Sequence, residues 1–445
     1  MYGRRPRPPL RPKRRWPWVV AILLLVAFGW FYLWDEPPRD DSALRLHLPA
    51  IADEQNGLVQ LRHLPVTALD FDAFTKYQGG TDTAPLPRIR TDTPTPLVDT
   101  FLAQAQPTFT QLDKVLALPH FENTGDISGG TPLPDVPIAF AVAQALRLEV
   151  IRSLQKGDYA TATKDTLRLR RLASRLTEGY TFITQYLNAN AVYGLSALSA
   201  RDLLNAPSLP EAQLDTLAHA YETNAPSLAA FQRTLDLTYQ VANSQLAQAY
   251  RYPPKAHGLD YLKFLWDRLT FKPNATHREL ADFYGSWGKA LQLPYADINF
   301  SPLEARNVHP HSGLAFLAPN SGGHAFLIST ALSPKVLQYP YWEVAMDRLL
   351  RTGYAMRVYY VEHGTLPLTL ASLVPRYLPA LPSQPLEGQP FQYDRSRGLL
   401  YSVGTSLKDS GGSRYATALI STGPAPEDPL MDLSQPTLVL TFQKK

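Results

Sequence analysis

The sequence contains no cysteine, so disulfide bonds, thiolate nucleophiles and thiolate metal ligands are excluded. A chain of 445 residues can bury a core without disulfide bonds, whereas secreted eukaryotic domains more often contain them. The sequence also lacks the Gly-Lys-Ser/Thr ending of phosphate-binding loops and the Gly-x-Ser-x-Gly motif of α/β-hydrolases. The absence of cysteine favours a bacterial envelope protein over a secreted eukaryotic one. The absence of the two motifs leaves no standard catalytic motif.

Acidic residues are missing from the first fifteen positions, which carry seven cations. The following run, Trp16 to Trp34, is uncharged and mostly apolar. As a helix it would be roughly 28 Å long, close to the thickness of the hydrocarbon core of a bilayer. Aromatic rings that suit the headgroup region lie near both of its ends. They are Trp16, Trp18, Trp30, Tyr32 and Trp34. We therefore predict a transmembrane helix.

Charge sets the expected orientation of this helix. Acidic residues follow it, at Asp35, Glu36, Asp40 and Asp41, so the positive-inside rule predicts a cytoplasmic N-terminus. The alternative is a cleaved signal peptide, which would end in small residues rather than in Trp, Phe and Tyr. We predict a single-pass protein of the bacterial inner membrane with its bulk in the periplasm.

Net charge does not indicate a nucleic-acid partner. The chain carries +4, of which the first fifteen residues contribute +7, so the remainder carries −3. Topology and anionic lipid account for the basic tail. The expected partners are the membrane and another envelope protein, with no nucleic acid.

The predicted fold is mainly α: a transmembrane helix, a helical bundle or irregular tetratricopeptide-like body, and a small C-terminal antiparallel β element. Proline, glycine and hydrophobic periodicity define the expected boundaries. They are a basic tail at 1–15, the transmembrane helix at 16–34, an extended linker at 35–97, the helical body at 98–338, and a helix with a β hairpin at 339–445.

The helical body has its clearest pattern between Ile138 and Leu176. Apolar residues recur every three or four positions and are interrupted at Gly157-Asp158, which predicts two helices joined by a turn. This turn resembles the hairpin turn of tetratricopeptide-like repeats, but no series with a period near 34 residues follows. Further helices are expected at about 178–204, 210–223, 226–250, 258–269, 276–292 and 339–362. The periodicity fails between Pro294 and Pro334.

Glycine and proline shape the C-terminal part. Gly364 suits a left-handed helix cap, and a proline-rich connector follows it. Phe391 to Asp394 and Leu399 to Val403 read as the two arms of a hairpin. Thr437 to Phe442 is a candidate third strand.

This last fifth of the chain resembles the C-terminal region of the major pseudopilin of type II secretion systems. There a long helix leads to a hairpin and to a loop that binds calcium. It is also similar to the tail of large, poorly characterised bacterial envelope proteins that have a basic anchor and a helical body. Gln384 precedes Pro385 at the position where the pseudopilin hairpin motif has an aspartate. Asp409 is the one carboxylate in the loop 405–413. Calcium takes six to eight oxygen ligands, so calcium at Asp409 is an alternative to our expectation of no cofactor.

Histidines in the 294–334 segment form the best metal-ligand cluster. His309, His311 and His324 lie near Asp297 and Glu304. Three such ligands and a water molecule would make a zinc hydrolase site. However, His309 and His311 point oppositely on a strand, and Pro310 prevents a helix, so a surface loop is the favoured interpretation.

Two further polar groups have simple structural interpretations. Lys164, Arg168, Arg171 and Arg175 share one helix face, which favours a solvated surface paired with Asp165 and Glu178 over a lipid or anion site. At Glu362-His363, an interaction of His363 with the helix dipole is favoured over an acid/base pair of the two residues.

The sequence thus favours a protein without enzymatic activity, an interaction or assembly component of the envelope with a link to secretion. No catalytic residue is assigned. The alternatives are an anchored, metal-dependent periplasmic hydrolase that uses the 294–334 loop, and a small-ligand sensor that would need a signalling partner.

Overall fold

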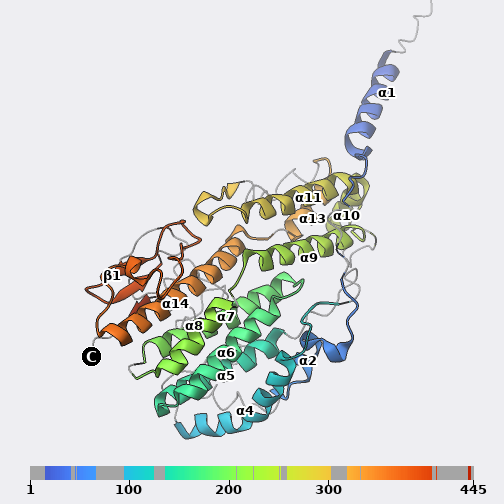
Figure 1. The fold of residues 1–445 in the computed structure, drawn as a ribbon. Coiled ribbons are helices and arrows are strands. Elements are labelled where there is room, and N and C mark those ends of the chain that lie inside the picture. Colours follow the sequence, from blue (N-terminus) through green and yellow to red (C-terminus); the bar gives the residue numbers. More distant parts are fainter. Residues whose placement is uncertain are drawn as a thin grey trace, which may run out of the picture. The chain divides into compact units, whose positions relative to one another are not determined.

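The computed structural model is mainly helical, with a small antiparallel sheet, and this confirms the general fold class predicted from the sequence (Figure 1). The residues that it describes are 16–41, 46, 48–66, 95–124, 136–206, 208–223, 225–249, 251, 258–301, 318–330, 332–402, 407 and 439–441. The predicted basic tail therefore lies outside the described residues.

The chain forms two compact units, each made of several segments. Unit 1 comprises Met1–Ala43, Ala242–Asp282 and Ala305–Ala331. Unit 2 comprises Leu44–Val241, Phe283–Glu304 and Leu332–Lys445. The division falls within the helices α9 (Leu228–Leu246) and α11 (Pro273–Ala290).

Unit 1 begins with the apolar helix α1 (Trp16–Phe28), which continues as the π-helix η1 (Gly29–Leu33). The predicted transmembrane helix is therefore α-helical only as far as Phe28. Among the described residues, no helix has both the length and the hydropathy needed to cross a membrane. The unit also contains α10 (Leu259–Thr270) and α13 (Ser321–Thr330), which pack together.

Unit 2 contains most of the described helices, and their bounds, except those of α4, agree closely with the periodic segments of the sequence. They are α4 (Thr95–Leu116), α5 (Val136–Lys156), α6 (Tyr159–Leu176), α7 (Ile183–Leu204), α8 (Glu211–Thr223) and α14 (Gln338–His363). Short helical segments are η3 (Asp53–Gln55), α2 (Gly57–Gln60), η4 (Leu61–His63), η6 (Tyr295–Asp297), η8 (Pro334–Leu337) and η9 (Leu370–Leu373).

The turn between α5 and α6 follows directly from its two residues. Gly157 has φ +70°, a left-handed conformation that ends α5 at little steric cost. Asp158 then caps α6, because its carboxylate accepts a hydrogen bond from the Thr161 amide at 3.1 Å. The predicted break at Gly157-Asp158 is confirmed.

Helices in unit 2 pack on their sequence neighbours, as expected, and on one distant helix. α5, α6 and α7 pack against one another, and α14 packs on α7 and α8 although it begins more than 110 residues after the end of α8 (Figure 1). The core of unit 2 is filled by large apolar and aromatic side chains. Those with almost no exposed surface include Tyr186, Tyr221, Trp342, Tyr354, Phe109, Phe121 and Leu112.

The sheet at the C-terminal end has the strand order β1-β2-β3 and is antiparallel throughout. The strands are β1 (Gln392–Asp394), β2 (Leu399–Tyr401) and β3 (Val439–Thr441). The predicted hairpin and the candidate third strand are thus confirmed. Gly364 ends α14 with φ +68°, and its amide donates to the Tyr360 carbonyl oxygen at 2.9 Å, which confirms the predicted left-handed cap.

Candidate functional site

A cluster of charged and aromatic side chains lies inside unit 2, where α6, α7, α8 and α14 meet. Arg170 of α6 and Asp347 of α14 lie at its centre, and their side chains are only 3% and 4% exposed. Arg170 belongs to a strongly basic helix, but its position on the helix turns it inward, away from the face shared by Lys164, Arg168 and Arg171. It is therefore a core residue.

The Arg170 side chain has both an ionic and an aromatic partner. Its Nη1 atom lies 2.6 Å from Asp347 Oδ1, and its guanidinium carbon lies 3.8 Å from the centroid of the Tyr221 ring. The hydroxyl group of Tyr193 donates to the same Asp347 oxygen at 3.2 Å. Buried charges are tolerated when they are paired and hydrogen-bonded in this way.

A second carboxyl group, Glu343, lies one helical turn before Asp347. It accepts a hydrogen bond from the Tyr186 hydroxyl group at 2.9 Å. Burial raises the pKa of Glu343 to about 7, since the charged form loses its hydration, and the nearby Asp347 carboxylate adds to this increase. Glu343 therefore gains or loses a proton near neutral pH.

Burial also raises the pKa of Asp347, but the Arg170 guanidinium opposes this effect. The Arg170–Asp347 pair is formally neutral, so the charge of the whole cluster depends on the protonation of Glu343. At a pH below the pKa of Glu343, these three side chains carry no net charge. At a pH above it, they carry one negative charge.

Aromatic rings enclose these charges. Tyr221 lies 5.4 Å from Tyr354, and Tyr193 meets Trp342 edge to face at 6.4 Å. Within the described part of the chain, the Tyr354 hydroxyl group and Trp342 Nε1 have no hydrogen-bond partner. A buried carboxyl group with a pKa near 7 is chemically suited to proton transfer, but Glu343 is only 7% exposed. The geometry thus favours a role in fixing how α6, α7, α8 and α14 pack.

Sequence reasoning missed this cluster, because its members are far apart in the chain. A signal was present in α14, where Glu343 and Asp347 are spaced by four residues within a run of Tyr, Trp, Val, Met and Leu. Two carboxyl groups on an otherwise apolar helix surface indicate a buried polar partner. The sequence did not identify Arg170 as that partner.

On the predicted basic face of α6, Lys164 and Arg171 are exposed, as expected, whereas Arg168 and Arg175 are largely buried in ion pairs. Arg168 binds Asp165 at 2.6 Å and also pairs with Asp113 of α4, and its side chain is 12% exposed. Arg175 pairs with Glu178. The Arg168–Asp113 pair joins α6 to α4.

Two of the predicted zinc ligands, His309 and His311, lie outside the described residues, as does the predicted calcium ligand Asp409. His324 lies on α13, half-exposed, with Nε2 3.9 Å from Glu279 Oε1 in the same unit. Across the described part of the chain, no group of three or more His, Asp or Glu side chains could hold a metal ion. The zinc and calcium sites stay predictions.

Glu362 and His363 form a small exposed cluster with Tyr377 at the end of α14. The Tyr377 hydroxyl group donates to Glu362 Oε2 at 2.5 Å and lies 3.0 Å from His363 Nε2. Arg376 lies 2.7 Å from the same Glu362 oxygen. The hydrogen bond from Tyr377 holds the pKa of Glu362 below its usual value. This arrangement fixes the helix end to the connector.

Gln384, at the position of the pseudopilin aspartate, is fully buried. Its Oε1 atom accepts a hydrogen bond from the Ser402 hydroxyl group at 2.7 Å, and its Nε2 atom donates to Glu387 at 3.2 Å. A neutral amide thus links the connector to the end of the β2 strand.

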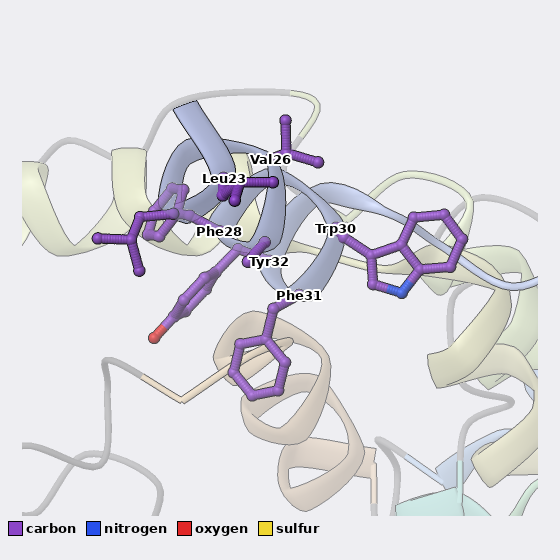
Figure 2. A pocket seen from close by; sticks show the side chains of 8 residues that line it. Leu23, Val26, Phe28, Trp30, Phe31 and Tyr32 are labelled. Atoms are coloured by element: carbon purple, nitrogen blue, oxygen red, sulfur yellow. The ribbon is translucent and has the colours of Figure 1, made fainter. Parts of the chain in front are cut away.

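Most of the exposed large apolar side chains among the described residues belong to unit 1. An open hollow of about 650 Å³ runs along α1 and η1 and is lined by eight of their residues. Figure 2 shows the side chains of Leu23, Val26, Phe28, Trp30 and Phe31 projecting from the helix in several directions. This helix is therefore apolar on all sides and has no polar face to turn toward water.

A polar network holds the C-terminal end of this helix within unit 1. The Asp35 carboxylate accepts hydrogen bonds from the amides of Asn274 and Ala275 at 2.8 and 3.1 Å, at the start of α11. Asp41, only 5% exposed, lies 3.1 Å from His277 Nε2.

Comparison with known proteins found no matching family model, no matching curated protein and no matching solved structure.

Proposed function

We propose that this protein is a single-pass protein of the bacterial inner membrane, anchored by Trp16–Leu33, whose periplasmic helical unit binds another envelope protein. The observation that carries the proposal is the exposure of the anchor: the side chains of Trp16, Leu24 and Leu25 are 77%, 66% and 69% exposed. Transfer of each such side chain from water to an apolar environment is favourable by roughly 1.5–3 kcal/mol of free energy. A helix that is apolar on all sides suits lipid.

The length and the ends of the segment support the same conclusion. The helical stretch from Trp16 to Leu33 is roughly 27 Å long at 1.5 Å per residue, close to the thickness of the hydrocarbon core. Trp30 and Trp34 stack at 4.8 Å near its C-terminal end, where interfacial aromatic residues are expected. Cations precede the segment and carboxylates follow it, so the N-terminus would be cytoplasmic.

The proposed binding role rests on the helical hairpins and on the lack of an accessible catalytic constellation among the described residues. α5, α6 and α7 pack as consecutive helices, an arrangement that helical repeat proteins use to present binding surfaces. The buried Arg170 cluster would keep that surface rigid. The resemblance of the C-terminal hairpin to a pseudopilin is the one reason to look for the partner among secretion components, and it is an analogy.

The test is crosslinking of the tagged full-length protein in intact bacteria, followed by membrane fractionation and metal analysis of the purified sample. The proposal expects the protein in the inner-membrane fraction, a reproducible crosslink to one envelope protein, and no stoichiometric metal. A protein recovered from the soluble fraction would refute the anchor. Near-stoichiometric zinc without a crosslinked partner would instead favour the hydrolase alternative and direct attention to His309, His311 and His324.

A further inference from the structure

The helix α10 in unit 1 is inverted relative to an ordinary surface helix. Its polar residues Asp267 and Thr270 are 7% and 1% exposed, and the Ser321 hydroxyl group donates to Asp267 at 2.6 Å. Four of its apolar residues are exposed: Leu262, Leu265 and Leu269 are 61%, 40% and 59% exposed, and Tyr261 is 39% exposed, whereas Phe264 and Trp266 are partly buried. A surface helix in water normally places its leucines inward.

The exposed side chains lie on one stripe of the helix. The spacing of Leu262, Leu265 and Leu269 by three and four residues brings them to the same face. A contiguous apolar stripe of this kind marks a contact with a membrane or with another protein, whereas scattered exposed leucines do not.

The place of α10 in unit 1 indicates which of these contacts it makes. Trp266 packs edge to face on Tyr32 of η1 at 5.7 Å, and Lys272 Nζ donates to the Phe31 carbonyl oxygen at 2.8 Å. α10 therefore lies directly beside the lower end of the apolar helix, as Figure 1 also shows. If α1 and η1 span a membrane, the surface of that membrane lies beside α10.

The charges of α10 are consistent with a lipid surface. Arg268 is exposed beside the apolar stripe, Lys263 is partly exposed near Asp260, and Lys272 follows the helix. Cations beside an apolar stripe that contains Tyr and Leu are typical of helices that lie in the headgroup region, where anionic lipids attract them.

We propose that α10 lies in the plane of the bilayer, with Tyr261, Leu262, Leu265 and Leu269 inserted at the boundary between headgroups and acyl chains. The inference rests on the proposed anchor and adds a second, peripheral contact with the same membrane. Continuity with η1 and the flanking cations favour lipid over a second copy of the chain or another protein.

The test uses the absence of cysteine, which allows single labelling sites in the full-length protein. Leu262→Cys, Leu265→Cys and Leu269→Cys would each carry an environment-sensitive fluorophore in vesicles of phosphatidylcholine and phosphatidylglycerol. The matched control is Asp260→Cys, on the opposite side of the same helix, where the side chain is 78% exposed. Leu24→Cys reports on the anchor itself. Lipids with a quenching group near the headgroup end of the acyl chain identify insertion to about 5–10 Å.

The proposal expects a blue-shifted emission and a loss of fluorescence to the quencher at 262, 265 and 269, and neither at 260. If position 24 responds but the three leucine positions do not, the anchor stands and the interfacial helix is refuted. If position 24 does not respond, the proposed function fails as well. An equal response at 260 would mean a contact that surrounds α10, and this would overturn the proposed orientation.

Discussion

Arg170 and Asp347 form an ion pair of 2.6 Å, although their side chains are almost completely removed from water. They come from helices separated by more than 160 residues of sequence. Because each charge is stabilised mainly by the other, the pair specifies how α6 meets α14.

Removal of one member of this pair should destabilise unit 2 strongly. We expect Asp347→Asn or Arg170→Met to lower the free energy of unfolding by about 3–5 kcal/mol, since an unpaired buried charge remains. Chemical denaturation followed by circular dichroism measures this loss. Arg376→Met is the control: Arg376 is 67% exposed in its pair with Glu362, so a change within about 0.5 kcal/mol is expected. Equal losses in the two variants would contradict the assigned role.

The raised pKa of Glu343 predicts a specific dependence of stability on pH. The pKa rises from its ordinary value of 4.5 to about 7 on folding, so the folded protein binds the proton more tightly. The associated stability is fully present below pH 4.5 and is lost as the pH rises through 7, by an amount on the order of 3 kcal/mol. Glu343→Gln should remove this loss. Unfolding measured from pH 4.5 to 8 checks it, and parallel pH profiles for the two proteins would refute the assignment.

A carboxylate within α1 should release the protein from membranes. An Asp in the middle of a transmembrane helix costs about 2.5–3.5 kcal/mol, so Leu24→Asp should lower the fraction that resists alkaline extraction. Leu368→Asp is the matched control, because Leu368 is 71% exposed in unit 2 and is assigned no membrane contact. Retention of Leu24→Asp at the level of Leu368→Asp would contradict the proposed anchor.

Gly57 should not tolerate a side chain. A Cβ atom at this position would overlap the ring of Phe121, which is fully buried and cannot move without disturbing α4 and α2. We expect Gly57→Ala to destabilise unit 2 by about 1–3 kcal/mol. Gly285 lies in α11, and no neighbouring atom lies within 4 Å of a Cβ added there. Gly285→Ala should therefore raise the free energy of unfolding by up to about 1 kcal/mol. Thermal unfolding of both variants tests the contrast.

The parts of the fold that were predictable depend on local chemistry. Gly157 and Asp158 mark the ends of α5 and α6 through their own backbone and side chain, and Gly364 marks the end of α14 in the same way. α4 was not recognised as a separate helix, since it begins after a run of proline and threonine and contains Pro107. α13 begins with Ser, Gly and Gly, which favour a loop until tertiary contacts hold the segment in a helix.

The candidate site was much less predictable. Whether Arg170 faces water or the core depends on Asp347 and Tyr221, which no local pattern near Arg170 contains. The outward apolar stripe of α10 was visible as a helical pattern, but periodicity does not indicate which face points outward. Only the burial of Asp267 and Thr270 resolves this.

The hydrogen bonds between Asp35 and the start of α11 join residues 239 and 240 positions apart. A ribosome that adds about 5–20 residues per second needs roughly 12–48 s to synthesise that interval. The apolar helix is thus synthesised long before the amides that the Asp35 carboxylate will bind. Unit 1 therefore cannot be completed until its last segment, Ala305–Ala331, has also been translated.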